Sequence, residues 1–352
     1  FFSLIYFIYT FYYISDAKVY FIRSLSYETS FFVGSSGIDY IISLLRKNLN
    51  FQYLTIFLIF SLIGSLGLLF FDSTIKISAK NSSPKIKKIL SLIVLLPSIS
   101  FWSSAIGKDS IAFLSVTLFL YSFIELKNRN ILFYISFLLM FFVRPHIAIF
   151  FLISGLVYYL FSNNFFTIKS IFNTILLILF LIFVLPFSLQ YAGVISTNDF
   201  WSLDLNLLIN KVLLFTEHRQ NLNLFGGSSV NIKDMSTFER IFTYFFRPQL
   251  YEAHNVYAFV SSMDNLVILI LFIFWIYNII YFIFTKKIIF IKLKINIFLG
   301  ILLYVIFTSL ILSATTANLG IAVRQKWMIL PLIIYLIIIS TKSLHYENTD
   351  SK

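Results

Sequence analysis

Long apolar runs separated by shorter polar segments dominate the pattern of this chain. The runs lie at 1–14, 53–71, 89–106, 110–124, 131–143, 147–161, 171–189, 265–284, 297–313 and 327–341. Repeated apolar runs of about 17 or more residues are typical of membrane-spanning helices, and tilt or a polar cavity accommodates the shorter ones. We therefore predict an all-α, polytopic membrane helical bundle with about ten transmembrane helices. We expect it to form a single integral membrane domain over residues 1–352.

The segments between these runs fall into two alternating sets with different charge. One set contains fourteen basic residues and four acids: Lys76, Lys80, Lys85, Lys87, Lys88, Lys127, Arg129, Lys169, Lys286, Lys287, Lys292, Lys294, Lys342 and Lys352 against Asp72, Glu125, Glu347 and Asp350. Short loops rich in Lys and Arg stay in the cytoplasm, so we predict a multi-pass protein with both termini cytoplasmic. The opposite face then carries one larger external loop region, 190–264. There the 203–215 stretch, like 38–49 earlier, predicts an amphipathic surface helix.

Composition supports the membrane interpretation and excludes other classes. The chain is 59% hydrophobic and 12% charged, which is too apolar for a soluble domain. The net charge of +12 is explained by the basic loops, so no nucleic-acid partner is expected. The absence of cysteine excludes thiolate metal sites, and the four histidines lack the spacing of metal ligands. We therefore predict no metal and no cofactor.

Charged residues at membrane depth cost about 2.5–3.5 kcal/mol and usually mark a cavity or a site. Asp16, with Tyr20 one turn later, follows the first run. Its carboxylate suits a general base acting on an acceptor hydroxyl, and the alternative is a helix cap in an ordinary loop. Lys108 and Asp109 follow a Ser- and Gly-rich stretch between two runs. Lys108 is expected to bind a phosphate, or to pair with Asp109 at a tight turn.

Arg144 and His146 flank Pro145 inside a continuous apolar stretch. Pro145 breaks the helix and frees backbone groups. An unpaired Arg at this depth requires an acidic partner across the bundle, Asp16 or Asp109, or an anionic ligand. The planar guanidinium is well suited to phosphate oxygens.

Two further clusters lie nearer the C-terminus. Arg247, Glu252, His254 and Asn255 fall within nine residues beside aromatic side chains. They suit a sugar or phosphate site, and the alternative is a polar turn on the membrane surface. Asn318, Arg324 and Lys326 lead into the last run, where a helix N-terminus also favours anions, so Arg324 and Lys326 are expected to complete a phosphate clamp. Lys326 alternatively extends its amine to the membrane interface.

The cations of these clusters suggest one shared ligand. We expect Lys108, Arg144, Arg247 and Arg324 to bind a multiply charged anion, for which a polyprenyl pyrophosphate is the obvious membrane-embedded candidate. A cationic site also stabilises pyrophosphate as a leaving group. With Asp16, Glu252 or Asp109 as the base, the predicted reaction is glycosyl transfer from a lipid carrier to a sugar hydroxyl.

The order of these motifs resembles a known family. The matching pieces are Asp16-x3-Tyr20, Phe101-Trp102-Ser103-Ser104 with Gly107-Lys108-Asp109, Arg144-Pro145-His146, Phe246-Arg247-Pro248 with Glu252-Ala253-His254-Asn255, and Asn318-Leu319-Gly320 with Arg324-Gln325-Lys326. They are similar to motifs of bacterial envelope-polysaccharide membrane proteins, namely the O-antigen and exopolysaccharide repeat-unit polymerases and the wider GT-C-type glycosyltransferases. The resemblance implies a GT-C-like fold, the bacterial inner membrane, a polyprenyl-linked donor and other polysaccharide-assembly proteins as partners.

Three other functions stay open from the sequence. A transporter or flippase for a lipid-linked oligosaccharide requires polar residues through both leaflets and usually internal repeats. A non-catalytic subunit of an envelope polysaccharide complex requires no catalytic group. An O-acyltransferase requires a histidine at membrane depth, and His146 is the one candidate. The charges gather on the external side and no repeat is evident, which favours the glycosyltransferase.

Overall fold

The computed structural model describes most of the chain. The described residues are 2–13, 15–26, 31–80, 82, 84–162, 166–195, 205–224, 227–284 and 295–345. Within these ranges the regular structure is helical apart from one isolated bridge between Ser229 and Asn318. The helices are α1 (Phe2–Tyr12), α2 (Asp16–Ser26), α3 (Ser35–Leu49), α4 (Tyr53–Ser78), α5 (Pro84–Val94), α6 (Pro97–Ser103), α7 (Lys108–Phe123), α8 (Asn130–Val143), α9 (Pro145–Leu160), α10 (Ile168–Ala192), α11 (Leu205–Asn223), α12 (Thr237–Phe246), η1 (Leu250–Glu252), α13 (Val256–Phe284), α14 (Ile295–Thr315), α15 (Leu319–Gln325), η2 (Lys326–Met328) and α16 (Leu330–His345).

Small residues allow the central helices to pack closely. The Ser115 hydroxyl of α7 donates to the Ser136 carbonyl of α8 at 2.7 Å, and the Ser154 hydroxyl of α9 donates to the Gly300 carbonyl of α14 at 2.8 Å. A Cβ atom at Gly64 of α4 would collide with the backbone of Ser103, the last residue of α6. Helices in lipid associate through such close backbone approach and interhelical hydrogen bonds rather than through the hydrophobic effect.

Aromatic side chains fill the space between these helices. The ring of Phe119 stacks on that of Phe151 with centroids 4.1 Å apart, and Tyr304 packs 5.2 Å from Phe151. All three side chains are fully buried, and the Tyr304 hydroxyl donates to the Met328 carbonyl at 3.1 Å. The middle of the bundle is therefore an apolar core in which the buried tyrosine hydroxyl has a hydrogen-bond partner.

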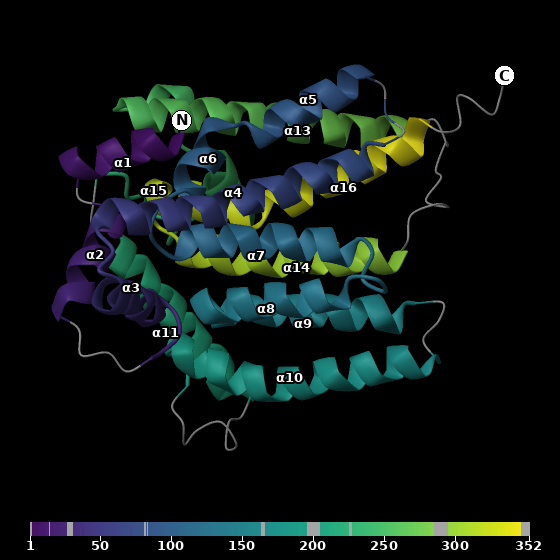
Figure 1. Cartoon of the computed structure of the whole chain (residues 1–352). Helices are drawn as coiled ribbons and strands as arrows, with labels where there is room; N and C mark the ends of the chain where they lie inside the picture. The colour runs from purple at the N-terminus through teal and green to yellow at the C-terminus, as the bar shows by residue number, and fades with distance from the viewer. Residues whose placement is uncertain are drawn as a thin grey trace.

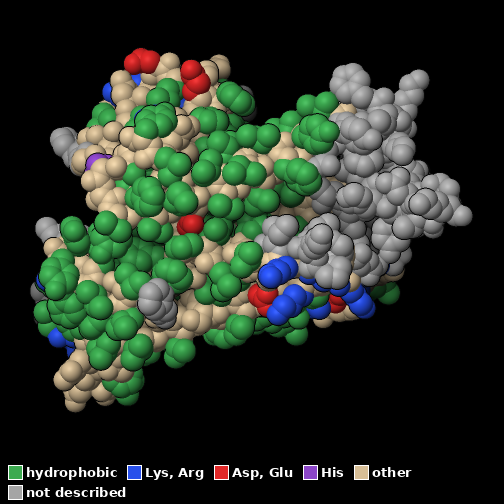
Figure 2. Space-filling view, turned by 90° about the horizontal axis from the view of Figure 1, so that it is seen from above, with side chains coloured by type: hydrophobic (Ala, Val, Ile, Leu, Met, Phe, Trp, Pro, Cys, Tyr) green, Lys and Arg blue, Asp and Glu red, His purple; other side chains and the backbone are tan. Residues whose placement is uncertain are grey.

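Among the described residues, four helices are long and apolar enough to cross a membrane, namely α4, α10, α13 and α14. A fifth crossing is possible if α15 with η2 and α16, which meet at an angle of 53°, form one broken span. Hydrophobic side chains are also spread widely over the described part of the face seen in Figure 2. These features are those of a helical membrane protein, as the sequence predicted. Other apolar helices, such as α8 and α9, have 14 and 16 residues, fewer than the roughly 20 that a 30 Å hydrocarbon core requires.

Several predicted boundaries differ from the structure. The run 89–106 is broken into α5 and α6 just before Pro97, because proline restricts the residue that precedes it and removes a backbone donor. Residues 16–26, for which a loop was one expectation, form the helix α2. The predicted surface helix at 203–215 extends to Asn223, and the expected external region 190–264 contains α11, α12 and η1.

Several helices, most of them short, gather at one end of the bundle. In Figure 1, α1, α2, α3, α6, α11 and α15 surround the end where α7 and α9 begin. The connections after α7 and α9 lie at the other end, where the Lys169 amine donates to the Lys127 carbonyl at 3.2 Å. The predicted basic turn with Lys127 and Lys169 thus lies at the opposite end from the polar residues that begin α7 and α9, while the predicted basic segment 286–294 lies outside the described residues.

Candidate functional site

A cavity of about 830 Å³ opens among the short helices at this end of the bundle. Its wall includes residues from α2, α7, α9, α10, α11, α14 and α15, with further residues from α1, α3, α6 and α8. Seven predicted site residues line it: Asp16, Tyr20, Lys108, Asp109, Arg144, His146 and Arg324. Residues separated by more than 300 positions therefore share one cavity.

Local backbone features place the charged side chains at the cavity. Arg144 lies between α8 and α9, where Pro145 begins the new helix and frees the chain to turn. Gly107 precedes α7 with φ of 146°, a conformation that L side chains rarely adopt. A Cβ atom there would also lie 3.1 Å from the Tyr20 ring. Glycine thus allows Lys108 and Asp109 to start α7 directly against α2.

Ion pairs connect four of the predicted residues in a row. The Arg324 guanidinium pairs with the Asp16 carboxylate and lies 4.0 Å from Oδ2 of Asp109. The other oxygen of Asp109 accepts a hydrogen bond of 2.9 Å from Arg144. The sequence predicted that Arg144 needs either an acidic partner, Asp16 or Asp109, or an anionic ligand, and the structure pairs it with Asp109.

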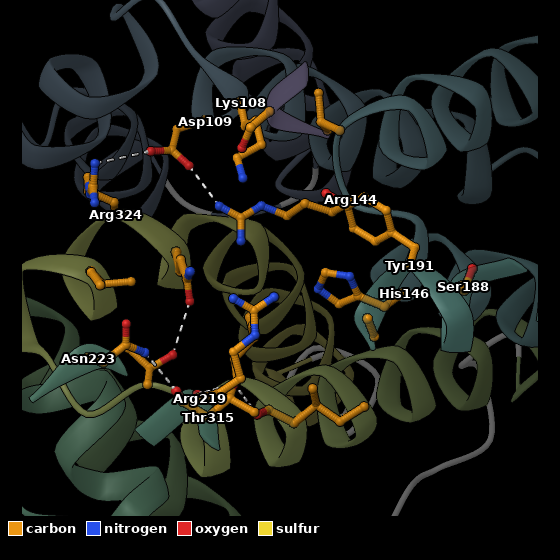
Figure 3. Close-up of a pocket in the computed structure, with 18 of the residues that line it drawn as sticks. Lys108, Asp109, Arg144, His146, Ser188, Tyr191, Arg219, Asn223, Thr315 and Arg324 are labelled. Carbon is orange, nitrogen blue, oxygen red and sulfur yellow. Dashed lines mark hydrogen bonds and ion pairs between the residues drawn. The ribbon is translucent and has the colours of Figure 1, made fainter. Parts of the chain in front are cut away.

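The remaining cations surround open space in the cavity. Figure 3 shows the guanidinium groups of Arg144 and Arg219 pointing toward the same space, with Lys108 and the His146 ring beside it. The Arg144 side chain is only 10% exposed, yet its Nε makes no hydrogen bond within the described part of the chain. The buried Nδ1 of His146 likewise lacks a partner there. Five basic side chains and two carboxylates line the cavity, so its polar part is suited to an anion.

The other part of the cavity is apolar. It is lined by Ile149, Phe150 and Ile153 of α9, by Leu185 and Leu189 of α10, and by Leu310 to Leu312 of α14. From Arg144 to Ile153 the wall extends about 14 Å along α9, at 1.5 Å per residue. Beyond it, the Ser154–Gly300 contact joins α9 to α14. The cavity therefore combines a cationic end with an apolar end.

The two carboxylates of the cavity differ in access. Burial alone would raise the pKa of Asp16, but the Arg324 guanidinium, with Lys108 and Arg23 contributing, lowers it below its ordinary value. The Asp16 side chain is 60% exposed, whereas Asp109 is 25% exposed and lies between two guanidinium groups. Asp16 is thus an ionised carboxylate within reach of a ligand, while Asp109 orients Arg144 and Arg324.

Anion binding should weaken as the pH rises through the titration of Lys108. Burial, followed by the Arg144 guanidinium, lowers the pKa of Lys108 to about 8, although Asp109 and Asp16 oppose the shift. The amine is charged below this pH and neutral above it. Equilibrium binding of an alkyl phosphate from about pH 7 to pH 9.5, above the second phosphate pKa near 6, should show about a fivefold to tenfold loss. Lys108→Arg should remove most of this dependence, and an unchanged pH profile in that variant would contradict the assignment.

Arg247, Glu252, His254 and Asn255 lie outside the cavity wall. Arg247 pairs with Glu252, whose carboxylate also accepts from the Gln249 backbone at 2.7 Å. Burial would raise the pKa of Glu252, but these hydrogen bonds lower it. Asn255 accepts from the Ala258 backbone at 2.8 Å at the start of α13, and His254 is exposed. Local contacts thus account for three of the four side chains.

Asn318 and Lys326 also lie away from the cavity. The Asn318 side chain caps α15 by accepting from the backbone of Gly320 and Ile321. Lys326 is completely buried, and its amine donates to the side chain of Asn265 on α13. The neighbouring Asp264 accepts from the Ser98 backbone at 2.7 Å at the start of α6. These residues thus stabilise the places where one helix ends and another begins.

Sequence reasoning missed several residues of the cavity wall. Arg219 of α11 lies 5.4 Å over the Phe215 ring, and Arg23 of α2 pairs with Asp39 at 3.3 Å. Tyr191 stacks near His146 with ring centroids 6.3 Å apart. One sequence feature could have identified Arg219. The helical pattern of 203–215 continues to this residue and would have placed it on the predicted surface helix.

Comparisons with protein-family models, with curated proteins and with solved structures found no match to this chain. The arguments for function therefore come from the geometry of the cavity.

Proposed function

We propose that this protein is a membrane glycosyltransferase of the polysaccharide-polymerase type, which uses a glycan carried on a polyprenyl phosphate or pyrophosphate. The observation that carries the proposal is the division of one cavity into a cationic and an apolar end. An inorganic anion requires no apolar wall, and a neutral lipid requires no buried guanidinium. A lipid phosphate requires both.

The residues have separate roles in this proposal. Lys108, Arg144, Arg219 and Arg324 hold the phosphate groups, and the apolar walls of α9, α10 and α14 receive the first part of the polyprenyl chain. Asp16 accepts the proton of an acceptor hydroxyl as its oxygen attacks the anomeric carbon of the donor sugar. The bond from that carbon to the phosphate oxygen breaks, and polyprenyl phosphate or pyrophosphate leaves with its new charge stabilised by the cations.

The core below the cavity argues against a transporter. Phe119, Phe151 and Tyr304 pack tightly across the middle of the bundle, and Ser154 contacts Gly300 beneath the apolar walls. A flippase requires a polar path for the glycan through both leaflets. The charges of the described cavity lie at one end, which is the arrangement expected of an enzyme working at one membrane face.

The proposal includes the finer topology expected from the sequence. It comprises about ten membrane-crossing helices in a GT-C-like arrangement, in the bacterial inner membrane. The cavity faces outward, both termini lie in the cytoplasm, and other polysaccharide-assembly proteins are partners. The position of Lys127 and Lys169 at the end opposite the cavity supports this orientation, because short basic loops remain cytoplasmic.

Purified protein in lipid nanodiscs should lengthen the glycan of a polyprenyl-pyrophosphate-linked repeat oligosaccharide and release polyprenyl pyrophosphate. Asp16→Asn should slow the reaction by about a hundredfold or more, since the amide cannot accept the proton. Both products are measured by mass spectrometry. Asp72→Asn is a matched control, because Asp72 pairs with Lys76 near the other end of α4. Tight lipid binding without any glycan transfer would refute the enzyme and leave the non-catalytic alternative.

A further inference from the structure

A second, smaller cavity adjoins the cationic one. It has a volume of about 360 Å³ and is lined by Phe32, Val33, Ser35, Ser36, Phe187, Gln190 and Tyr191. Ser35 and Tyr191 line both cavities, so the two share a wall. The smaller cavity lies where the segment leading into α3 meets the C-terminal part of α10.

The chemistry of this wall differs from that of its neighbour. Its seven residues carry no charge and combine aromatic rings with hydroxyl and amide groups. The Phe32 ring lies 6.1 Å from that of Phe187 and 6.2 Å from that of Tyr191, between ring centroids. Ser36 and Gln190 provide groups that both donate and accept hydrogen bonds. Ring faces also attract the weakly positive C–H groups of a sugar.

From these contacts we infer that the smaller cavity is a saccharide subsite, which binds the neutral sugar attached to the phosphate held by Arg144 and its neighbours. This inference rests on the proposed function and adds to it a position for the donor sugar. The Tyr191 ring connects the two sites, because its other neighbour is His146, two residues from Arg144. A phosphate at Arg144 therefore presents its sugar to the aromatic wall, while its lipid chain follows the apolar side of α9.

The location of the smaller cavity also explains the close contact between Gly34 and Tyr191. A Cβ atom at this residue would collide with the Tyr191 hydroxyl, and φ of 81° is itself unfavourable for other residues. The Gly34 backbone donates to the Phe142 carbonyl at 2.7 Å, which fixes this segment against α8. Ser35 and Ser36 follow directly. The backbone thus places Ser35 and Ser36 in the wall that Tyr191 also lines, and the Ser35 hydroxyl accepts a hydrogen bond of 3.4 Å from Tyr20.

Binding of two lipids tests the subsite. The first probe is polyprenyl pyrophosphate, and the second carries one neutral hexose or N-acetylhexosamine, tested in a small panel. We expect the wild-type protein to bind at least one sugar-bearing lipid about tenfold more tightly than the sugar-free lipid. Phe187→Ala and Gln190→Ala should each remove most of that difference and leave the affinity for the sugar-free lipid within about twofold.

Phe183→Ala is the matched control, one turn away on α10 with a side chain that is exposed and outside both cavities. It should change neither affinity. If no sugar in the panel strengthens binding to the wild type, or if the two variants weaken both lipids equally, the subsite is refuted while the phosphate site stands. If the sugar-free lipid itself does not bind, the proposed function fails together with this inference.

Discussion

Arg144→Gln should reduce the affinity for polyprenyl monophosphate by about a hundredfold, or about 2.7 kcal/mol. Arg144 is nearly buried and donates to Asp109 at 2.9 Å, and its Nε has no hydrogen-bond partner among the described residues. Its loss removes a cation and leaves the Asp109 carboxylate, 4.0 Å from Arg324, to repel the phosphate. Isothermal titration in detergent micelles measures the change.

Two further variants separate charge from geometry. Arg144→Lys keeps the charge but loses the planar donor arrangement, so we expect about a tenfold weakening. Arg129→Gln is the control from the opposite end of the bundle, where Arg129 pairs with Glu125 at 3.0 Å and lies 4.0 Å over the Tyr121 ring. It should bind the lipid like the wild type. Equal affinities of Arg144→Gln and Arg129→Gln would show that the cavity does not bind phosphate.

The meeting of cations distant in sequence was predictable, because an isolated charge in an apolar run is costly unless it has an acidic partner or faces a polar cavity. Arg144 has no acid near it in sequence, so a partner across the bundle or a ligand was required. The structure provides Asp109 as that partner and brings Arg324 and Asp16 to the same cluster. The cost of a charge at membrane depth therefore indicated Lys108, Arg144 and Arg324 correctly as neighbours, whereas Arg247, expected to join them, lies outside the cavity.

The same reasoning predicted less well which residues reach the cavity where a charged side chain finds its partner nearby in the sequence. Arg247 and Glu252 are five residues apart and pair with each other beside η1, so neither has to reach the cavity. A sequence pattern does not distinguish such a pair from two residues facing a ligand. The polar residues of 246–255 consequently form a separate cluster, and the cavity is lined without them.

Short helices and their packing were also difficult to predict from the sequence. Helix α2 has 11 residues and little intrinsic stability, because isolated helices of this length are marginal in water. It is held by contacts distant in sequence, such as the ion pair from Arg23 to Asp39 on α3. Arg219 on α11 was missed for a related reason. Its nearness to Arg144 depends on where α11 packs, and hydrophobic periodicity does not specify that position.

Lys326→Met should lower the thermal stability of the protein severely while leaving lipid-phosphate binding nearly unchanged. The amine of this fully buried Lys donates to Asn265, next to the buried carboxylate of Asp264. Removing one partner from a buried charged network costs about 3–5 kcal/mol, because the remaining charge loses its compensation. Asp264 would be that charge, with the Ser98 backbone at 2.7 Å as its remaining donor. Unfolding midpoints in detergent, followed by tryptophan fluorescence, measure the effect.

A double variant shows whether the loss comes from the uncompensated carboxylate. Lys326→Met with Asp264→Asn keeps an oxygen acceptor for the Ser98 backbone and removes the charge, so its midpoint should lie above that of Lys326→Met alone. Lys18→Met, at an exposed position of α2, should change the midpoint little. The sequence suggested that Lys326 completes a phosphate clamp with Arg324. Loss of phosphate binding with an unchanged midpoint would support that clamp. The expected result would instead show that Lys326 stabilises the helix break that places Arg324 at the cavity.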